Sequence, residues 1–306
     1  MPDWIRERGI GETRLARIEQ GAIVEARIDL DGVVAPGSLL TATLVRSGRN
    51  GVARDTAGAE YLLPDGAPGI TEGAQATIVV TRAAIPGIES WKRPLAKLAE
   101  ADRGEAPFEP VDGMLPSEWD DIIEEARGGM VRFAGGELRL SPTAAMTLID
   151  VDGTLPAKEL AMAGARAAAR AILRLDIGGS IGIDLPTVPG KAVRQAVGDA
   201  VDSILPKPFE RTAMNGFGFV QVVRPRRRAS LLELAADRAA FEARALMRRV
   251  GGEAAGAKRV VAHPAVVALL EGNPRWLAEL ARQCGGAIGL RADPSLPISG
   301  GYAEPA

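Results

Sequence analysis

MTLIDVD at residues 146–152 and SIGIDL at residues 180–185 are short apolar runs, each with aspartate at or near its end. A segment of helical length, rich in Ala, Arg and Leu, separates them. This order predicts a strand, a helix and a second strand, a crossover that is nearly always right-handed and leaves both strands parallel in one sheet. Because ligand sites of open α/β sheets lie at the carboxyl ends of their strands, we expect Asp150 and Asp184 to lie close together there.

Two carboxylates in one crevice repel each other unless a cation or a proton offsets their charge. When the substrate carries phosphates, a divalent ion such as Mg²⁺ usually does so. We therefore predict that Asp150 and Asp184 are metal ligands, with Mn²⁺ as an alternative ion. Asp152 shares a strand face with Asp150, because side chains alternate along a strand, and is a third candidate. The competing interpretation is that strand-terminal aspartates only cap loops or helices.

The composition excludes several classes of protein. A chain of 306 residues has room for two or more domains, and its net charge of −2 argues against coating nucleic acid by charge alone. The single cysteine, Cys284, excludes a disulfide framework and a cysteine-rich zinc site, and it fits a reducing cytoplasm. No apolar run reaches the roughly 18–20 residues that a membrane span needs. We predict a cytoplasmic protein without a membrane partner.

The single histidine, His263, restricts the chemistry further. A ribonuclease that uses two histidines as acid and base is excluded. A Ser-His-Asp triad would need His263, and no Gly-x-Ser-x-Gly turn accompanies it. We predict a structural or surface role for this residue.

Two groups of arginines are candidates for binding a phosphodiester backbone. Arg166, Arg170 and Arg174 are spaced by four, which places them along one face of the expected helix. Arginines at 224, 226, 227 and 228 follow the strand expected at 217–224 and would also suit phosphates. The alternatives are a solvated helix face and a charged loop. The residues that we select as contacts of such a backbone are Arg170, Arg174, Arg224, Arg226 and Arg228.

In the first part of the chain, alternating apolar and charged residues predict a hairpin over 13–30. The short, evenly spaced strands that follow suggest a small barrel or OB-like module. These strands are expected at 39–45, 51–55, 60–63 and 74–81. A helical patch is expected at 95–101, within a connection rich in Pro, Gly, Lys and Glu.

The rest of the chain mixes helices and strands. Ser117 is expected to cap a helix over 117–127, one long helix is expected over 231–250, and 292–306 has the composition of a loose tail. The other elements are expected at 130–133 and 137–140 (a hairpin), 156–175 and 191–205 (helices), 217–224 (a strand) and 258–291 (a β-α-α-β unit).

Several ordered motifs between residues 131 and 231 resemble the catalytic core of the ribonuclease E / ribonuclease G family of bacterial endoribonucleases. The stretches that carry the resemblance are GGELRLSPTAAMTLIDVD at 135–152, LRLDIGGSIGID at 173–184, FGFVQ at 217–221 and the arginine run at 224–231. GETRLA at 11–16 also looks like the start of the family, so the resemblance covers nearly the whole chain and is weakest at 86–116.

The resemblance implies Mg²⁺-dependent hydrolysis of single-stranded RNA that leaves a 5′-phosphate and a 3′-hydroxyl. Asp150 and Asp184 match the family's two magnesium-binding aspartates, and Asp152 matches a nearby asparagine that supports them. Tyr61 lies near the position where RNA bases would stack on the OB-like module.

Three departures from the family pattern stand out. No second cysteine exists, so the family's zinc-linked assembly is excluded and no zinc is expected. The region at 86–116 is too short for the family's sensor of the RNA 5′-monophosphate. The OB-like segment lacks the family's aromatic residues, which predicts weaker RNA capture.

Together these observations predict a mixture of α/β and α+β architecture. The expected parts are an RNase-H-like subdomain at 1–34, an inserted OB-like module at 35–88, a connection with the second part of the RNase-H-like subdomain at 89–140, a βαβ catalytic domain at 141–230 and a small C-terminal αβ domain at 231–306. The expected function is a metal-dependent endoribonuclease for RNA processing or decay. Two alternatives stay open, an inactive RNA-binding protein of the same fold and an interaction module whose arginines are merely solvated; a homodimer is a further possibility.

Overall fold

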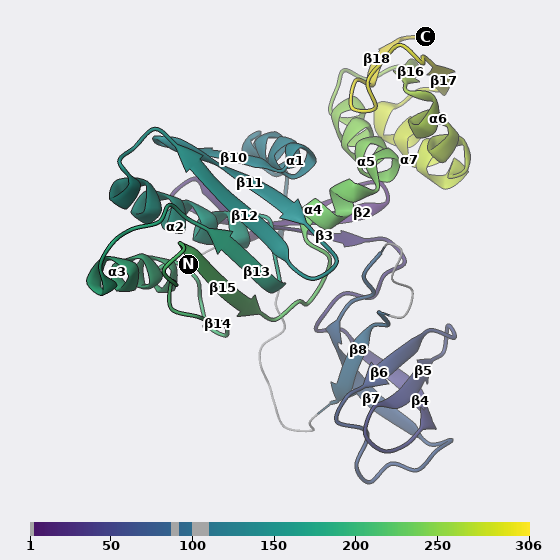
Figure 1. The fold of residues 1–306 in the computed structure, drawn as a ribbon. Helices are drawn as coiled ribbons and strands as arrows, with labels where there is room; N and C mark the ends of the chain where they lie inside the picture. The colour runs from purple at the N-terminus through teal and green to yellow at the C-terminus, as the bar shows by residue number, and fades with distance from the viewer. Residues whose placement is uncertain (1–2, 87–91, 100–109) are drawn as a thin grey trace.

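The computed structural model describes residues 3–86, 92–99 and 110–306 (Figure 1). Within these residues the protein has a mixed α/β architecture, with sheets of four, six and three strands and a closed five-stranded barrel. No helix in the described part of the chain is both long and apolar enough to cross a membrane.

The N-terminal sheet has the strand order β3-β2-β1-β9. Its strands are β1 (Asp3–Arg8), β2 (Glu12–Glu19), β3 (Ala22–Leu30) and β9 (Val111–Asp112). The β2–β3 hairpin confirms the hairpin expected over 13–30. Its turn uses Gln20 and Gly21, both at positive φ, a conformation that suits glycine.

The barrel closes in the order β4-β5-β6-β8-β7. Its strands are β4 (Leu39–Arg46), β5 (Gly51–Asp55), β6 (Glu60–Leu63), β7 (Gln75–Arg82) and β8 (Leu95–Leu98). The four strands expected before residue 82 are confirmed, but the helical patch expected at 95–101 is wrong, because 95–98 is a strand. Pairing with β6 and β7 closes the barrel and buries Ala96, which outweighs the local helix propensity of Leu and Ala. Residues 100 and 101 lie outside the described residues.

The central sheet has the order β10-β11-β12-β13-β15-β14. Its strands are β10 (Met130–Phe133), β11 (Gly136–Pro142), β12 (Thr147–Gly153), β13 (Gly179–Asp184), β14 (Glu210–Arg211) and β15 (Phe219–Arg224). β12 and β13 are parallel neighbours joined by a helix, as expected. The boundary expected between residues 140 and 141 falls inside β11 and therefore divides one sheet.

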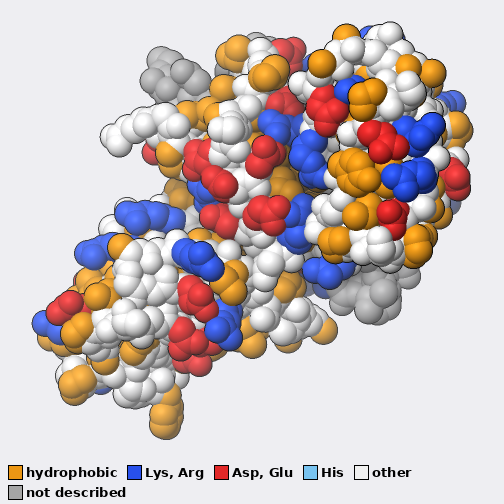
Figure 2. Space-filling model, turned by 90° about the horizontal axis from the view of Figure 1, so that it is seen from above, with side chains coloured by type: hydrophobic (Ala, Val, Ile, Leu, Met, Phe, Trp, Pro, Cys, Tyr) orange, Lys and Arg blue, Asp and Glu red, His pale blue; other side chains and the backbone are white. Residues whose placement is uncertain are grey.

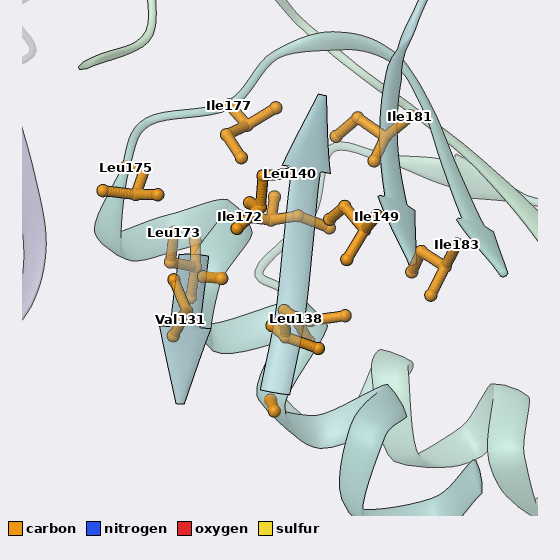
Figure 3. Close-up of a cluster of buried hydrophobic side chains, with 14 of the residues drawn as sticks. Val131, Leu138, Leu140, Ile149, Ile172, Leu173, Leu175, Ile177, Ile181 and Ile183 are labelled. Carbon is orange, nitrogen blue, oxygen red and sulfur yellow. The ribbon is translucent and has the colours of Figure 1, made fainter. Parts of the chain in front are cut away.

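Helices cover one face of this sheet. They are α2 (Ala157–Arg174) and α3 (Lys191–Asp202), which pack against each other. Figure 3 shows Leu138, Ile149 and Ile183 of three neighbouring strands gathered with Ile172 of α2 in the apolar layer. Full burial of each such side chain contributes about 1.5–3 kcal/mol to stability. Gly164 lets α2 approach the sheet closely, since a Cβ there would lie 2.4 Å from a Val151 methyl carbon.

Helix ends differ from expectation at two places. α1 (Glu118–Gly128) begins after Ser117, but the Ser117 side chain makes no capping hydrogen bond. The single helix expected over 231–250 is wrong; it is two helices, α4 (Leu231–Ala236) and α5 (Arg238–Gly251). The break lies at Asp237, whose backbone is non-helical and whose side chain accepts a hydrogen bond from the Ala240 N–H at 3.2 Å. An aspartate that caps the next helix can therefore interrupt a long apolar pattern.

The C-terminal unit contains β16 (Lys258–Ala262), α6 (Pro264–Glu271), α7 (Pro274–Cys284), β17 (Ile288–Ala292) and β18 (Tyr302–Pro305). The expected β-α-α-β unit is confirmed. The loose tail is wrong, because β18 pairs antiparallel with β16 and completes a three-stranded sheet. His263 is structural, as predicted: its Nδ1 accepts a hydrogen bond from the Ala265 N–H at the start of α6.

Ion pairs join α5 to the N-terminal sheet. Arg14 pairs with Glu7 and Glu12, and Arg248 pairs with Glu7 at 2.8 Å. Burial opposes ionisation of Glu7, but hydrogen bonds from Arg248 and the Leu115 N–H, with the charge of Arg14, bring its pKa below the ordinary value. A cavity of about 120 Å³ lies here between α1, α5 and the sheet.

Seen from above, acidic side chains gather in the middle of the molecule with basic ones directly beside them (Figure 2).

Candidate functional site

Asp150 and Asp184 lie directly opposite each other in the parallel strands β12 and β13. Neighbouring strands are about 4.8 Å apart, so the two Cα atoms are separated by one strand spacing. Asp184 is the last residue of β13, and its pairing with Asp150 ends the β12–β13 ladder. Residues paired in this way project from the same face of a sheet, so both carboxylates belong to one surface.

That surface is the face of the sheet opposite α2. Ile149 and Ile183 are fully buried on the α2 side, whereas Asp150, Asp152 and Asp184 are exposed. The alternation is the ordinary consequence of the two-residue period of a strand. In Figure 1 the strands β11 to β15 lie in front of α2, with no helix drawn across their near side.

The strand register places the pair within a longer row of side chains. Across five strands the row consists of Met130, Arg139, Asp150, Asp184 and Phe219. A guanidinium therefore flanks the carboxylates on one side and an aromatic ring on the other. We call these five residues the sheet row.

A second row lies beside it, with Arg132, Glu137 and Asp152 opposite one another in β10, β11 and β12. On strands β10 to β13 this surface thus holds four carboxylates and two guanidiniums, an excess of two negative charges. Such an excess in one small area favours a bound cation.

Arg139 responds to these acids. Its Nε and Nη2 donate hydrogen bonds to a Glu137 carboxylate oxygen at 3.2 and 3.0 Å. That bond, the Glu137 charge, and the charges of Asp152 and Asp150 raise the pKa of the Arg139 guanidinium above its ordinary value. Asp150 and Asp152 are thus close enough to Arg139 to affect its charge. The Arg139 side chain is 61% exposed, so a ligand can contact it.

The donor set fits a hydrated divalent ion. Mg²⁺ is commonly held by one or two carboxylates, with waters and substrate phosphates completing its shell. Asp150 and Asp184 supply two exposed carboxylates from adjacent strands. No group of three or more His, Cys, Asp or Glu side chains placed to hold a metal is found among the described residues, so Asp152 does not complete a three-carboxylate cage.

Phe219 forms the apolar border of this site. A Cβ on Gly182 would lie 2.5 Å from the Phe219 ring and 2.9 Å from a Leu148 methyl carbon. The ring of Phe219, the strand partner of Asp184, therefore lies across Gly182. Only glycine at position 182 leaves room for an aromatic side chain on this face.

The arginines of α2 do not lie on this surface. Arg174 donates to Glu118 Oε1 at 2.6 Å, to Glu125 Oε2 at 2.9 Å and to the Ile23 carbonyl oxygen at 3.0 Å. It therefore joins α2 to α1 and to the N-terminal hairpin. Arg170 is exposed, but on a helix that covers the opposite face of the sheet. The expected row of guanidiniums beside the acidic site is wrong.

The arginine run at 224–228 is also committed to protein contacts. Arg228 pairs with Asp29 at 3.0 Å and with Asp176 at 3.4 Å, and Arg224 donates to the Ile177 carbonyl oxygen at 3.2 Å. Further along the run, Arg226 pairs with Glu233. These three guanidiniums are partly buried and fasten the end of β15 to its neighbours, so their charges are largely offset within the protein.

Tyr61 is not a surface platform. Its side chain is 2% exposed in the barrel core, and its hydroxyl is 3.1 Å from Asp55 Oδ2. Burial, the hydrogen bond to Asp55 and the negative charge of Asp55 raise the pKa of Tyr61 to about 12. The expectation that bases stack on Tyr61 is wrong, because β6 turns this side chain inward.

Arg139 and Phe219 were missed as site residues by sequence reasoning. A signal for Arg139 exists: Thr143 closes the β11–β12 turn with hydrogen bonds to Met146, and counting outward from that turn places Arg139 opposite Asp150. No comparable signal exists for Phe219, because a long connection separates β13 from β15.

No protein-family model matches this chain, and a search of curated proteins finds no significant match.

Proposed function

We propose that this protein is a divalent-metal-dependent endoribonuclease that hydrolyses phosphodiesters of single-stranded RNA. The observation that carries the proposal is the pairing of Asp150 with Asp184 on the exposed face of the central sheet. The resemblance of the surrounding motifs to the ribonuclease E / ribonuclease G family supplies the substrate class. The absence of a second histidine agrees with chemistry that needs no histidine pair.

In this proposal Asp150 and Asp184 hold Mg²⁺, with Mn²⁺ as the alternative ion. An ion held there would supply an activated water and a Lewis acid for the phosphate, chemistry that would leave a 5′-phosphate and a 3′-hydroxyl. Asp152 lies two residues from Asp150 on the same face and orients water through its carboxylate. Arg139 is one strand away from Asp150 and pairs with a phosphate oxygen of the substrate.

The barrel supports an RNA-capturing role. Its five strands close in the order first, second, third, fifth, fourth, with the third and fifth parallel, and this supports the proposal that it is an OB-like module. Arg46 and Arg49 are exposed on it, and Arg54 is exposed but pairs with Glu60 at 2.7 Å. With Tyr61 buried, capture relies on these charges more than on stacking, and affinity should fall steeply as salt rises. The part proposed to be RNase-H-like is 1–34 with the second part at 89–140, to which the N-terminal sheet and α1 belong.

A second candidate function is RNA binding without cleavage. It is favoured by the burial of Tyr61, because a barrel with few exposed aromatic residues captures RNA more weakly than the resemblance implies. An inactive protein of this fold would bind single-stranded RNA with the same salt dependence and leave it uncut when Mg²⁺ is added.

One experiment separates these functions. End-labelled single-stranded RNA is incubated with the protein, with and without Mg²⁺, and both mobility and length are followed. We expect Mg²⁺-dependent shortening, lost by at least about a hundredfold in Asp184→Asn, about 2.7 kcal/mol in the activation barrier. Asp121→Asn, at an exposed aspartate on α1, is the matched control and should cleave normally. Bound but intact RNA supports the second candidate, and equal cleavage by Asp184→Asn overturns the metal assignment.

A further inference from the structure

Phe217 is an exposed aromatic residue in the turn that leads into β15, whose first residue, Phe219, pairs with Asp184. It is 86% exposed, a fraction equalled among the described large hydrophobic residues only by Met114. Single exposed apolar side chains are common on protein surfaces. Phe217 is distinguished by its position, two residues before Phe219 of the sheet row.

The turn that carries Phe217 is fixed by hydrogen bonds. The Asn215 side-chain oxygen accepts from the N–H groups of Phe217 and Phe219 at 2.9 and 3.0 Å. The Phe217 carbonyl oxygen accepts from the Thr187 hydroxyl at 3.2 Å. The Leu185 N–H donates to the Gly218 carbonyl oxygen at 3.2 Å. Residues 185–187 directly follow Asp184, so the turn is attached to the chain that leaves the proposed metal ligand.

Gly218 shows how closely these two segments approach. Its φ of +98° is a left-handed conformation, and a Cβ there would lie 2.0 Å from the Leu185 carbonyl oxygen. Only glycine permits this approach without displacing the chain. The backbone around Phe217 is therefore held in place before any ligand binds, which lowers the entropy cost of using the ring for recognition.

Two aromatic residues thus lie near Asp184 in the fold: Phe219 opposite it in the strand ladder and Phe217 in the turn that leads into β15. Phe219 lies over Gly182 and is half-buried, so most of its surface is already used in packing. Phe217 is left with a free ring in a fixed turn. An aromatic ring next to a phosphate-binding centre suits a nucleobase, because every base has a π-face that stacks regardless of sequence.

We propose that Phe217 is a substrate-positioning residue that stacks on the base of a nucleotide next to the scissile phosphate. The inference rests on the proposed RNA-cleaving function and adds to it a requirement for a base at a fixed offset from the cleaved bond. An RNA that carries an abasic ribose at that position should then bind weakly and be cleaved poorly, although its phosphates are intact.

The test compares Phe217→Ala, Phe217→Tyr and Met114→Ala with the parent protein. Substrates are one single-stranded RNA and versions of it with an abasic ribose on either side of the cleaved bond, one position at a time. Affinity is measured by fluorescence anisotropy in EDTA, and kcat and KM are measured with Mg²⁺. Melting temperatures verify that the variants fold, which is expected because the exposed ring adds little to the core.

We expect Phe217→Ala to weaken affinity and raise KM about tenfold, equivalent to about 1.4 kcal/mol. Phe217→Tyr should retain parental values, and Met114→Ala should change neither. One abasic substrate should cost the parent the same factor and cost Phe217→Ala nothing more, since the ring and the base act together.

Three results overturn the inference, and they differ from one another. Parental affinity and KM in Phe217→Ala, while the parent still cleaves, would sink the stacking role and leave the proposed function standing. An abasic penalty of equal size in the parent and in Phe217→Ala would show that the base is read elsewhere. If the parent neither binds nor cleaves RNA, the proposed function fails and this inference fails with it.

Discussion

The two faces of the central sheet treat their charged residues in opposite ways. On the open face, Arg139 is 61% exposed and stands beside carboxylates that outnumber the arginines around them. On the covered side, Arg174 is 18% exposed and holds Glu118 and Glu125 in ion pairs. The comparison teaches that an arginine can serve a ligand only where its side chain is exposed and the protein has not already used its charge in a buried ion pair.

The same lesson applies to the aspartates. Asp176 is partly buried among the arginines at 224 and 228, and its negative charge is offset within the protein. Among the described residues no arginine forms an ion pair with Asp150 or Asp184, and carboxylates are in excess on their face. The sequence alone presents all three as strand-flanking aspartates. Their different surroundings assign a structural role to the first and favour a cation at the other two.

The largest expected difference between the two faces is the loss of stability when an arginine is removed from each. Arg174→Ala should lower the free energy of unfolding by about 2 kcal/mol, because it leaves two partly buried carboxylates without their partner. Arg139→Ala, the matched change on the open face, should shift it by less than about 0.5 kcal/mol. Urea unfolding of both variants measures the difference. Equal losses would mean that the two faces are not distinguished in this way.

A smaller effect is expected inside the barrel. Tyr61→Phe removes the hydroxyl that bonds Asp55 and should cost about 1 kcal/mol of stability while leaving RNA affinity unchanged. Urea unfolding and anisotropy with single-stranded RNA check the two halves of this prediction. A large loss of RNA affinity without a loss of stability would show that Tyr61 contacts RNA and would contradict its burial in the barrel.

The smallest effect is a shift in titration. In Tyr302→Phe, Tyr61 is the only tyrosine left, and its phenolate absorbance should appear with a midpoint near the pKa of about 12, above the ordinary 10.0. Because the folded-state pKa is raised, the stabilising contribution of Tyr61 is complete below about pH 10 and is lost as the pH rises toward 12. A midpoint at the ordinary value would contradict the burial of this ring.

Sequence reasoning succeeded where structure is local. The β2–β3 hairpin, the β12–α2–β13 crossover and the neighbouring positions of Asp150 and Asp184 follow from periodicity and from the handedness of crossovers. It failed where distant segments decide the outcome. β8 is a strand because the barrel needs a fifth member, and β18 is a strand because the edge of β16 is free to pair.

The roles of side chains were harder to predict than the elements. The direction of Tyr61 depends on which face of β6 turns into the barrel, and neither face is marked in four residues. The partners of the arginines at 174 and 228 come from residues far away in sequence, Glu118 and Asp29. Spacing along a helix shows which arginines share a face, but not what that face packs against.

The most direct test of the account is a Mn²⁺ titration followed by electron paramagnetic resonance, which detects a bound ion whether or not RNA is cut. The parent protein should bind Mn²⁺, and Asp150→Asn and Asp184→Asn should each bind it at least about tenfold more weakly. Asp121→Asn should bind like the parent. If either Asp150→Asn or Asp184→Asn keeps the parental affinity, the two aspartates do not share an ion and the central claim is wrong.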